Sequence, residues 1–334
     1  MQEISISSYF LRAVLGQAQT AGLVIPDLLR RASIPIKLLA EEGARVTAEQ
    51  YATLQTITMR EMDDEMLGYG RLPLKVGTWS ALCHWLIHSR TLSQALKRFC
   101  LFYSLMQRGL KSDLSTNAGQ LSIRFSPWHD DEQLQPYAME LFIFGFHRLA
   151  CWLINDNLLV LSARFPYPKP DHYADYLVMF PGGPSLFAQP SCELIFDRKI
   201  MEIPIQQTPE TLSKFLRQPL LNMLINDYNQ KTWAAKTRAV LREELINSPN
   251  ITDVALKLSV HPRKLRRELG KEGISYGDLK NQLRRDIAIR YLTKTSKPVE
   301  KIAYLLGFSE ACTFTRAFRQ WTGVTPCSYR KQLN

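Results

Sequence analysis

The chain has 334 residues, 46% of them hydrophobic and 22% charged, a composition that excludes collagen-like, disordered and small disulfide-rich proteins. The net charge is +11, and all of the excess lies in the last third: residues 229–334 hold 21 Lys and Arg against 9 Asp and Glu. At roughly 150 residues per domain the length predicts two domains, and the charge indicates that only the C-terminal one meets a polyanion.

The chain carries no sign of export, membrane insertion or disulfide bonding. It does not open on a basic segment followed by an apolar core, so we expect no signal peptide. The longest apolar stretch, residues 141–154, includes His147 and Arg148 and is shorter than the roughly 20 residues of a membrane span. It predicts a buried helix. The six cysteines form no CxxC pair, which indicates reduced thiols in a cytoplasmic protein without a cofactor.

Residues 1–205 predict an α+β domain in which helices share a core with a small sheet. Thr47 and Thr91 precede two of the amphipathic segments and are expected N-caps. Apolar spacing predicts helices at 25–31, 47–62, 78–89, 91–106 and 134–154. Alternating or β-rich runs predict strands at 120–125, 158–165 and 192–196.

Residues 206–229 predict a helical connector between two domains. Pro219 lies inside its apolar pattern and is expected to kink the helix. The apolar stripe of this connector suits packing within the chain or the seam of a homodimer, and the sequence leaves both open. Residues 230–334 then form the basic second domain.

The basic part of the chain repeats itself. At an offset of 48 residues, Val254-Ala255 matches Ile302-Ala303 and Leu258-Ser259 matches Leu306-Gly307. The second copy has one extra residue at each of two later points, and with these insertions the match continues to the end of the copy. Each copy has a short helix with a small alanine, a turn, and a second helix. This is the pattern of a helix-turn-helix, present twice.

The local signals of each copy agree with this interpretation. Asn250 and Asp253 form an expected capping pair at the first helix, predicted near 251–258, and its counterpart is predicted near 298–306. Gly307 tolerates the positive φ of the turn. The second helices start after His261 and Ser309, of which Ser309 is the favoured cap.

The second helix of each copy separates into an apolar and a polar face. In the first copy Leu265 and Leu269 point inward and leave a basic face that faces solvent or DNA. In the second copy Phe314 and Phe318 are expected to pack inward, and Arg316 is placed to reach guanine. The outward positions are Arg263, Arg266, Arg267 and Gly270 in the first copy and Ala311, Cys312, Thr315, Arg316 and Arg319 in the second.

Residues 276–294 predict one continuous helix between the copies, since Leu279, Leu283, Ile287 and Tyr291 recur at helical intervals. Such a helix holds two recognition helices at a fixed separation. We therefore expect them to enter successive major grooves of double-stranded DNA, about 34 Å apart.

The stretch 299–330, VEKIAYLLGFSEACTFTRAFRQWTGVTPCSYR, closely resembles the signature of AraC/XylS-type transcription regulators, and residues 254–269 resemble the first helix-turn-helix of that family. The resemblance implies a bacterial, seven-helix DNA-binding domain that contacts promoter DNA and works with RNA polymerase. Carried over by position, the base-contact candidates are Arg263, Arg266, Arg267, Ala311, Cys312, Thr315 and Arg316. The phosphate-contact candidates are Lys264, Arg319, Tyr329 and Arg330.

Residues 28–35, 45–51, 89–96 and 192–197 resemble the effector domain of the AraC subgroup that is labelled arabinose-binding. The label does not imply a sugar; it implies a sensor for a small molecule. Aromatic side chains that would suit a ligand pocket are Trp79, Trp85, Phe146 and Trp152.

The sequence gives weaker evidence for other classes of function. His84 and His88 have the spacing of metal ligands, but the sequence offers no third ligand, and we expect no metal and no catalysis. Two alternatives stay open: a DNA-repair enzyme with an alkyl-accepting cysteine in its N-terminal domain, and an architectural DNA binder without an effector. The favoured interpretation is an effector-responsive activator of transcription.

Overall fold

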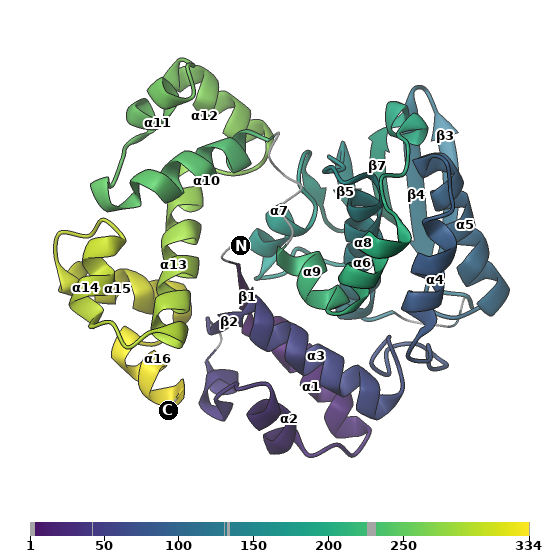
Figure 1. Ribbon diagram of the computed structural model, residues 1–334, viewed down its shortest axis with the longest axis horizontal. Helices are drawn as coiled ribbons and strands as arrows, with labels where there is room; N and C mark the ends of the chain where they lie inside the picture. The colour runs from purple at the N-terminus through teal and green to yellow at the C-terminus, as the bar shows by residue number, and fades with distance from the viewer. Residues whose placement is uncertain (1–3, 42, 130, 132–133, 226–231, 334) are drawn as a thin grey trace. The chain divides into compact units, whose positions relative to one another are not determined.

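The computed structural model describes residues 4–41, 43–129, 131, 134–225 and 232–333 (Figure 1). Its contacts divide the chain into two compact units that do not follow chain order. One unit joins residues 1–15 and 24–55 to 230–334, and the other holds residues 16–23 and 56–229. The division therefore falls inside two helices, α1 (Ser8–Thr20) and α3 (Ala48–Met62).

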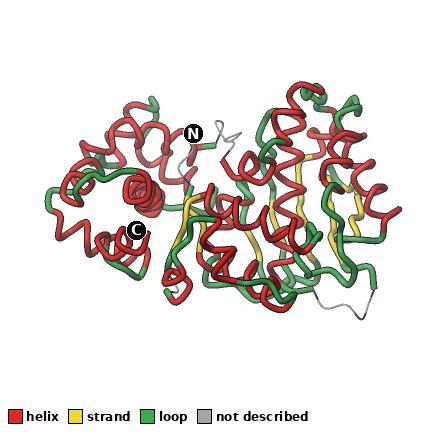
Figure 2. Tube along the Cα trace, turned by 60° about the horizontal axis from the view of Figure 1, so that its bottom comes forward, coloured by secondary structure: helices red, strands yellow, loops and turns green. Residues whose placement is uncertain are grey.

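The second of these units is the α+β part, as predicted. Its sheet has the order β3-β4-β7-β5-β6, antiparallel except for the β5–β6 pair (Figure 2). The strands are β3 (Lys111–Asn117), β4 (Gln120–Ser126), β5 (Ser162–Arg164), β6 (Ser185–Leu186) and β7 (Cys192–Asp197). The main helices are α4 (Thr78–Leu86), α5 (Leu92–Met106), α6 (Pro136–Ile154), α7 (Tyr176–Met179), α8 (Pro209–Leu216) and α9 (Pro219–Ile225).

An aromatic cluster joins the sheet to its helices. Phe125 of β4 meets Phe142 and Phe146 of α6 with ring centroids 6.1 and 5.3 Å apart, and Phe99 of α5 contacts the same two rings. Thr91 caps α5 as predicted, because its side chain accepts from the backbone N–H of Gln94. The core of this unit thus forms where α5 and α6 meet the sheet.

Helix α6 confirms the predicted buried helix. It is long and apolar enough to cross a membrane, but 89% of its most hydrophobic window is buried inside the protein. A helix that is apolar on all sides and enclosed by its own fold is a core helix.

His147 lies in the middle of α6 with no exposed surface, and its Nε2 is 2.7 Å from the carbonyl oxygen of Leu158. Burial lowers the pKa of His147 from 6.5 to about 4. The unfolded chain therefore binds a proton between pH 6.5 and 4 that the folded chain does not. The stability contribution of the neutral ring is complete above pH 6.5 and is lost as the pH falls through this window, by about 3 kcal/mol in total.

We expect His147→Gln to remove this pH dependence. Wild type should lose about 3 kcal/mol more stability than the variant between pH 7 and 4. Urea unfolding of the two proteins across this pH range measures the difference in stability, because the contributions of all other titrating groups are the same in both proteins. Identical pH profiles of wild type and variant would contradict the neutral state of the buried ring.

Three details of this unit differ from the sequence prediction. Strand β5 covers only three of the eight residues predicted, since Val160 makes an isolated bridge to Gly182 and Leu161 and Phe165 make single backbone hydrogen bonds outside the strand. Strand β3 was not predicted: its residues are polar and mostly exposed because it lies at the edge of the sheet. Pro219 does not kink one helix but begins a new one, α9, where its missing N–H costs no hydrogen bond.

The unit that contains the C-terminal residues is helical apart from a short antiparallel pair, β1 (Ser5–Ser7) and β2 (Arg45–Thr47). Its N-terminal segments add α2 (Ile25–Arg31) and parts of α1 and α3. Thr47 caps α3 as predicted, in a reciprocal pair of hydrogen bonds with Gln50. The remaining helices are α10 (Trp233–Glu244), α11 (Ile251–Lys257), α12 (Pro262–Lys271), α13 (Tyr276–Lys294), α14 (Val299–Leu305), α15 (Ala311–Thr322) and α16 (Pro326–Leu333).

Candidate nucleic-acid interface

The two repeats fold into two helix-turn-helix units, α11–α12 and α14–α15, as predicted. Ala255 and Ala303 are buried at matching positions of the first helices, where a larger side chain would separate the packed pair. In the second helices Leu265 and Leu269, or Phe314 and Phe318, are buried. Figure 1 shows α11 and α12 toward one end of α13, with α10 between them and α13, and α14–α16 toward the other end.

The turns have the predicted backbone. Ser259 and Gly307 occupy equivalent positions with φ of 55° and 72°, in the left-handed region. A Cβ on Gly307 would lie 2.2 Å from the carbonyl oxygen of Leu245, so glycine is required there for space as well as for conformation. Ser259 carries a Cβ at the equivalent position, so the turn of the first repeat accommodates a side chain.

The caps of the recognition helices differ from the prediction. His261, which is not a favoured cap, is the N-cap of α12, and its Nδ1 accepts from the N–H of Arg263 at 3.2 Å. Ser309 does not cap α15, which begins one residue later than expected behind Glu310 and has no side-chain cap. The predicted capping pair of Asn250 and Asp253 is confirmed at α11.

Helix α13 is the predicted continuous helix of 19 residues, about 28 Å long. Leu279, Leu283 and Ile287 are buried, as expected. Another face of the same helix holds both repeats, which the sequence analysis missed. Arg284 donates from Nε to the carbonyl oxygen of Leu306 at 2.9 Å and from Nη2 to Ser248 Oγ at 2.9 Å and the carbonyl oxygen of Gly307 at 3.0 Å.

Two neighbours of Arg284 extend this contact toward the first repeat. One turn earlier on α13, Lys280 donates to Ser248 Oγ and to the carbonyl oxygen of Pro249, and Tyr276 donates to the same carbonyl. Burial, with the charge of Arg284 nearby, lowers the pKa of Lys280 to about 8. We call Tyr276, Lys280 and Arg284 the anchoring face. It fastens the residues before α11 and the turn after α14 to one rigid helix.

The outward side of α12 is basic and accessible. Arg263 and Arg266 are exposed, and the guanidinium group of neither has a hydrogen bond or ion pair to the residues that the structure describes. Arg267 is exposed too, but its guanidinium pairs with Glu268 at 2.9 Å. Arg263 and Arg266 are thus the side chains of this helix that are available for a base edge without breaking a contact.

On α15 the predicted outward residues fall into two groups. Cys312, Arg316 and Arg319 are exposed, whereas Ala311 and Thr315 are half-buried. The Thr315 hydroxyl donates to the carbonyl oxygen of Ala311 at 2.9 Å, which leaves its methyl group and oxygen for a ligand. Within the described part of the chain Arg316 and Arg319 have no ion-pair partner.

The predicted phosphate contacts do not share one environment. Lys264 is exposed, with its Nζ 5.5 Å from the ring centre of Trp233, a geometry that orients the charge without neutralising it. Tyr329 has no exposed surface, and its hydroxyl donates to the carbonyl oxygen of Arg45 at 2.6 Å. A buried, engaged hydroxyl is out of reach of a phosphate. Arg330 is half-buried beside a pocket that is described below.

The N-terminal segment packs on the second repeat within the same unit, which the sequence did not reveal. Besides the bond from Tyr329 to Arg45, Ser5 Oγ donates to the carboxylate of Asp286 on α13. A Cβ on Gly43 would lie 3.2 Å from the backbone of residues 322 and 323. The pairing of β1 with β2 brings these contacts together.

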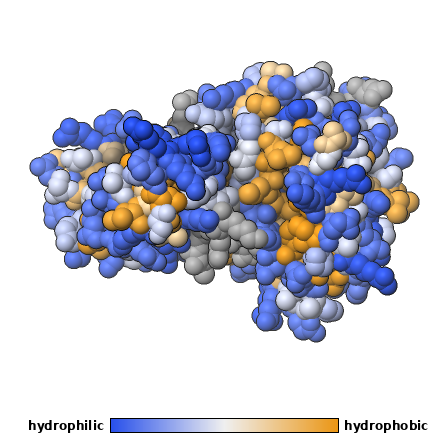
Figure 3. Space-filling view, turned by 90° about the horizontal axis from the view of Figure 1, so that it is seen from above, coloured by the Kyte–Doolittle hydropathy of each residue, from blue (hydrophilic) through white to orange (hydrophobic). Residues whose placement is uncertain are grey.

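The aromatic candidates for effector binding are mainly core residues. Phe146 and Trp152 are 2% and 5% exposed, and Trp152 stacks on Phe215 of α8 at 4.4 Å. Trp79 and Trp85 are half-buried, and the buried Nε1 of Trp79 has no hydrogen-bond partner among the described residues. Figure 3 shows hydrophobic residues gathered in a band on this α+β unit, and mostly hydrophilic residues on the part that carries α10–α12.

Four cysteines lie in the α+β unit, and three of them are buried. Burial raises the pKa of the thiols of Cys83, Cys100, Cys151 and Cys192, to about 12 for Cys100 and about 11 for Cys151. Such thiols are poor nucleophiles, since the thiolate is the reactive form. His84 is exposed, and in the described ranges no three His, Cys, Asp or Glu side chains gather to hold a metal.

Comparison with known proteins agrees with this geometry. Residues 22–205, more than half of the chain, match the arabinose-binding domain of AraC transcription regulators, and residues 254–332 match a helix-turn-helix domain. The ornithine utilization regulator of Pseudomonas aeruginosa is 27% identical over 258 residues, which cover 77% of this chain and 76% of that protein.

Two solved structures match this chain at lower sequence identity. The transcriptional regulator CdpR from Pseudomonas aeruginosa is 19% identical, with 96% of this chain and 97% of that chain covered and a TM-score of 0.31. The DNA-binding domain of AdpA in complex with a target DNA is 23% identical, with 30% and 92% covered and a TM-score of 0.28. From the match over residues 22–205 and the folded tandem repeat, the chain belongs to the AraC-type transcription regulators, with an N-terminal domain of the arabinose-binding type and a DNA-binding helix-turn-helix domain at its C-terminal end.

Proposed function

We propose that the protein is an effector-responsive activator of transcription in the bacterial cytoplasm, which reads promoter DNA with α12 and α15 in successive major grooves. The observation that carries this proposal is the attachment of both helix-turn-helix units to the single helix α13 through its anchoring face. The excess charge supports it, since residues 229–334 hold 21 Lys and Arg against 9 Asp and Glu. Transcription regulators of this family are not enzymes.

We further propose a division of labour along the chain. Residues 1–205 would bind the effector and mediate homodimer formation, residues 206–229 would connect, and residues 230–334 would contact DNA and RNA polymerase. Part of the connector and the start of the last segment, residues 226–231, lie outside the described residues, as does residue 334.

The contacts to DNA follow from exposure. Arg263, Arg266 and Arg316 are proposed to read bases, because they are exposed and have no ion-pair partner in the described chain. Lys264, Arg319 and Arg330 suit phosphates, and Tyr329 is left out because its side chain is buried. The remaining proposed base contacts are Arg267, Ala311, Cys312 and Thr315, with small side chains on α15 allowing close approach to thymine methyl groups.

Two substitutions distinguish a base contact from a phosphate contact. Arg316→Ala is expected to cost about 1–3 kcal/mol of binding to promoter DNA and to relax specificity at one base pair. Lys264→Ala is expected to weaken binding to all sequences alike and to lower the salt slope of the binding constant by about one. Titration of promoter and scrambled DNA at several salt concentrations measures both quantities.

Lys97→Ala serves as the control, because Lys97 is exposed on α5 in the α+β unit and its removal changes charge without touching either repeat. It should bind DNA as wild type does. If Arg316→Ala bound promoter and scrambled DNA with wild-type affinity, Arg316 would have no role in reading bases.

The effector is expected to bind the folded protein and to raise its melting temperature in a saturable way. Amino acids are the first class to screen, since a similar protein is named an ornithine utilization regulator. A thermal-shift screen of amino acids, lipids and sugars against the full chain tests this. Absence of saturable stabilisation by any of them would favour the architectural DNA binder instead.

A further inference from the structure

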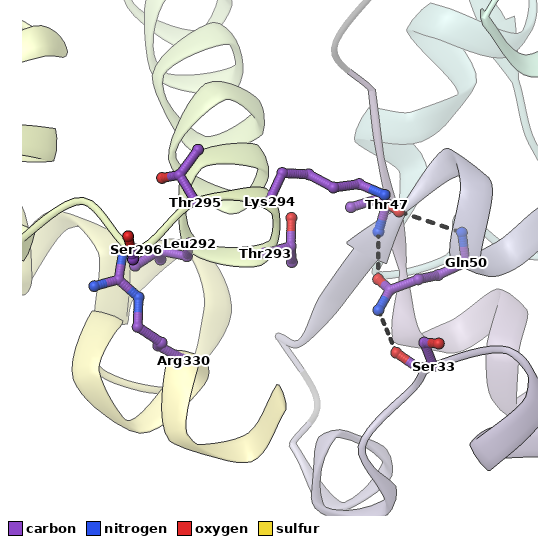
Figure 4. Close-up of a pocket in the computed structure, with 9 residues that line it drawn as sticks. All are labelled: Ser33, Thr47, Gln50, Leu292, Thr293, Lys294, Thr295, Ser296 and Arg330. Atoms are coloured by element: carbon purple, nitrogen blue, oxygen red, sulfur yellow. Dashed lines mark hydrogen bonds between the residues drawn. The ribbon is translucent and has the colours of Figure 1, made fainter. Parts of the chain in front are cut away.

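A polar pocket of about 450 Å³ lies in the unit that contains the second repeat (Figure 4). One wall comes from N-terminal residues, among them Thr47 and Gln50, and the other from the end of α13, the residues that follow it, and Arg330 of α16. Such a volume suits a small metabolite. None of the pocket residues has been given a role by the DNA-binding function above, apart from Arg330.

The pocket is positively charged. Lys294 and Arg330 both line it, and none of its nine described lining residues is acidic. Lys294 extends from α13 toward Thr47 across the pocket (Figure 4). Two buried nitrogens of Arg330, Nε and Nη2, have no hydrogen-bond partner among the described residues. A half-buried guanidinium without a counter-charge is costly, and an anion in the adjacent pocket would supply that charge.

The other polar groups that line the pocket indicate which hydrogen-bonding groups a ligand needs. The hydroxyls of Thr293 and Thr295 donate to the carbonyl oxygens of Ile289 and Tyr291 at 2.8 and 2.7 Å, so toward a ligand they present acceptor oxygens. The amide of Gln50 is held by Thr47 and by the carbonyl oxygen of Ser33. A ligand that matches this pocket carries both a negative group and hydrogen-bond donors. Beside two cations, hydroxyl donors fit better than an ammonium group.

We propose that this pocket binds a small hydroxylated organic anion, such as a sugar phosphate or a sugar acid, with Lys294 and Arg330 on its charged group. Because one wall belongs to the N-terminal segment and the other to α13, the residues after it and α16, a bound anion strengthens the contact between these segments that the bond from Tyr329 to Arg45 already makes. The site is independent of an effector in the α+β unit.

The test is isothermal titration of the full chain with three probes that share a three-carbon hydroxylated skeleton: glycerol 3-phosphate, glycerate and glycerol. Both anions are expected to bind saturably, and glycerol is not expected to bind. The anion that binds more tightly shows whether the pocket prefers a phosphate or a carboxylate group. Lys294→Gln and Arg330→Gln should each weaken the anions about tenfold, and Arg330→Lys should retain most of the affinity. Lys297→Gln and Lys331→Gln, exposed neighbours that do not line the pocket, are the matched controls.

A second readout locates the bound probe. Hydrogen exchange should slow at residues 45–50 and 292–296 when the anion binds and remain unchanged in Lys294→Gln. The proposal is overturned if neither anion binds, or if Lys297→Gln weakens binding as much as Lys294→Gln does. It is also overturned if Lys294→Gln weakens only DNA binding, which would make the pocket a contact for a DNA phosphate.

Discussion

Gly307→Ala is expected to destabilise the second helix-turn-helix by about 3 kcal/mol. The left-handed φ of 72° costs an alanine about 1–2 kcal/mol, and the added Cβ would lie 2.2 Å from the backbone oxygen of Leu245, which must move. The same movement disturbs the hydrogen bond from Arg284 to the carbonyl oxygen of Gly307. Hydrogen exchange of the amides of α14 and α15 measures the local loss of stability.

Gly270→Ala is the matched control, since it makes the same substitution in the same unit. Gly270 lies in α12, and a Cβ there would meet nothing within 4 Å. Alanine at this exposed helical position should stabilise the helix by about 0.5–1 kcal/mol. Equal effects of the two substitutions would show that the turn at Gly307 does not require glycine.

Arg284→Met is expected to lower the free energy of unfolding by about 2–4 kcal/mol. It should also weaken DNA binding more than the substitution of any single exposed arginine does. The variant leaves the carbonyl oxygens of Leu306 and Gly307 without their charged donor, and Ser248 Oγ keeps only the donor from Lys280. It also removes the guanidinium that lies 4.4 Å from the ring centre of Phe308. Both repeats then lose part of their attachment to α13. Urea unfolding and promoter titration measure the two effects.

Two further variants separate the geometry of Arg284 from its charge. Arg284→Lys keeps the charge but not the planar fork, so it should restore less than half of the lost stability. Asn281→Met places the same side chain at an exposed position of the same helix and should leave stability nearly unchanged. Wild-type stability and DNA affinity in Arg284→Met would refute the anchoring role of this residue.

The helix-turn-helix units were largely predictable because their signals are local. A small alanine, a turn residue with positive φ and a capping pair each act within a few residues, and their repetition removes the ambiguity of a single match. The caps of the second helices were predicted only from the average preference of residue types for the N-cap position, and this prediction was wrong. Serine is a better cap than histidine on average, but His261 caps α12 and Ser309 does not cap α15.

The contacts that fasten the repeats together were not predictable from pattern. Arg284 lies in a run of charged residues that reads as a solvated face, and its partners lie 22, 23 and 36 residues away. Tyr329 likewise resembled a surface residue near a basic end, and its partner Arg45 is 284 residues away. Such long-range pairs leave no periodic trace in a single sequence.

The sheet of the α+β unit shows the same limit. Strands β4 and β7 are amphipathic or buried and were recognised, whereas the edge strand β3 is polar and was not. The two-residue strand β6 is too short to carry a pattern at all. Their place in the sheet is set by pairing with β4 and β5, and this pairing depends on the folded chain rather than on local sequence.

The central claim is that two recognition helices on one rigid helix read two separate parts of a promoter. The most direct test is a base-by-base substitution scan of a bound promoter site, carried out with wild type, Arg266→Ala and Arg316→Ala. We predict that each variant loses discrimination at a different position and that the two positions lie about 10 base pairs apart, one turn of the duplex. Loss of discrimination at the same position in both variants, or at none, would contradict the account.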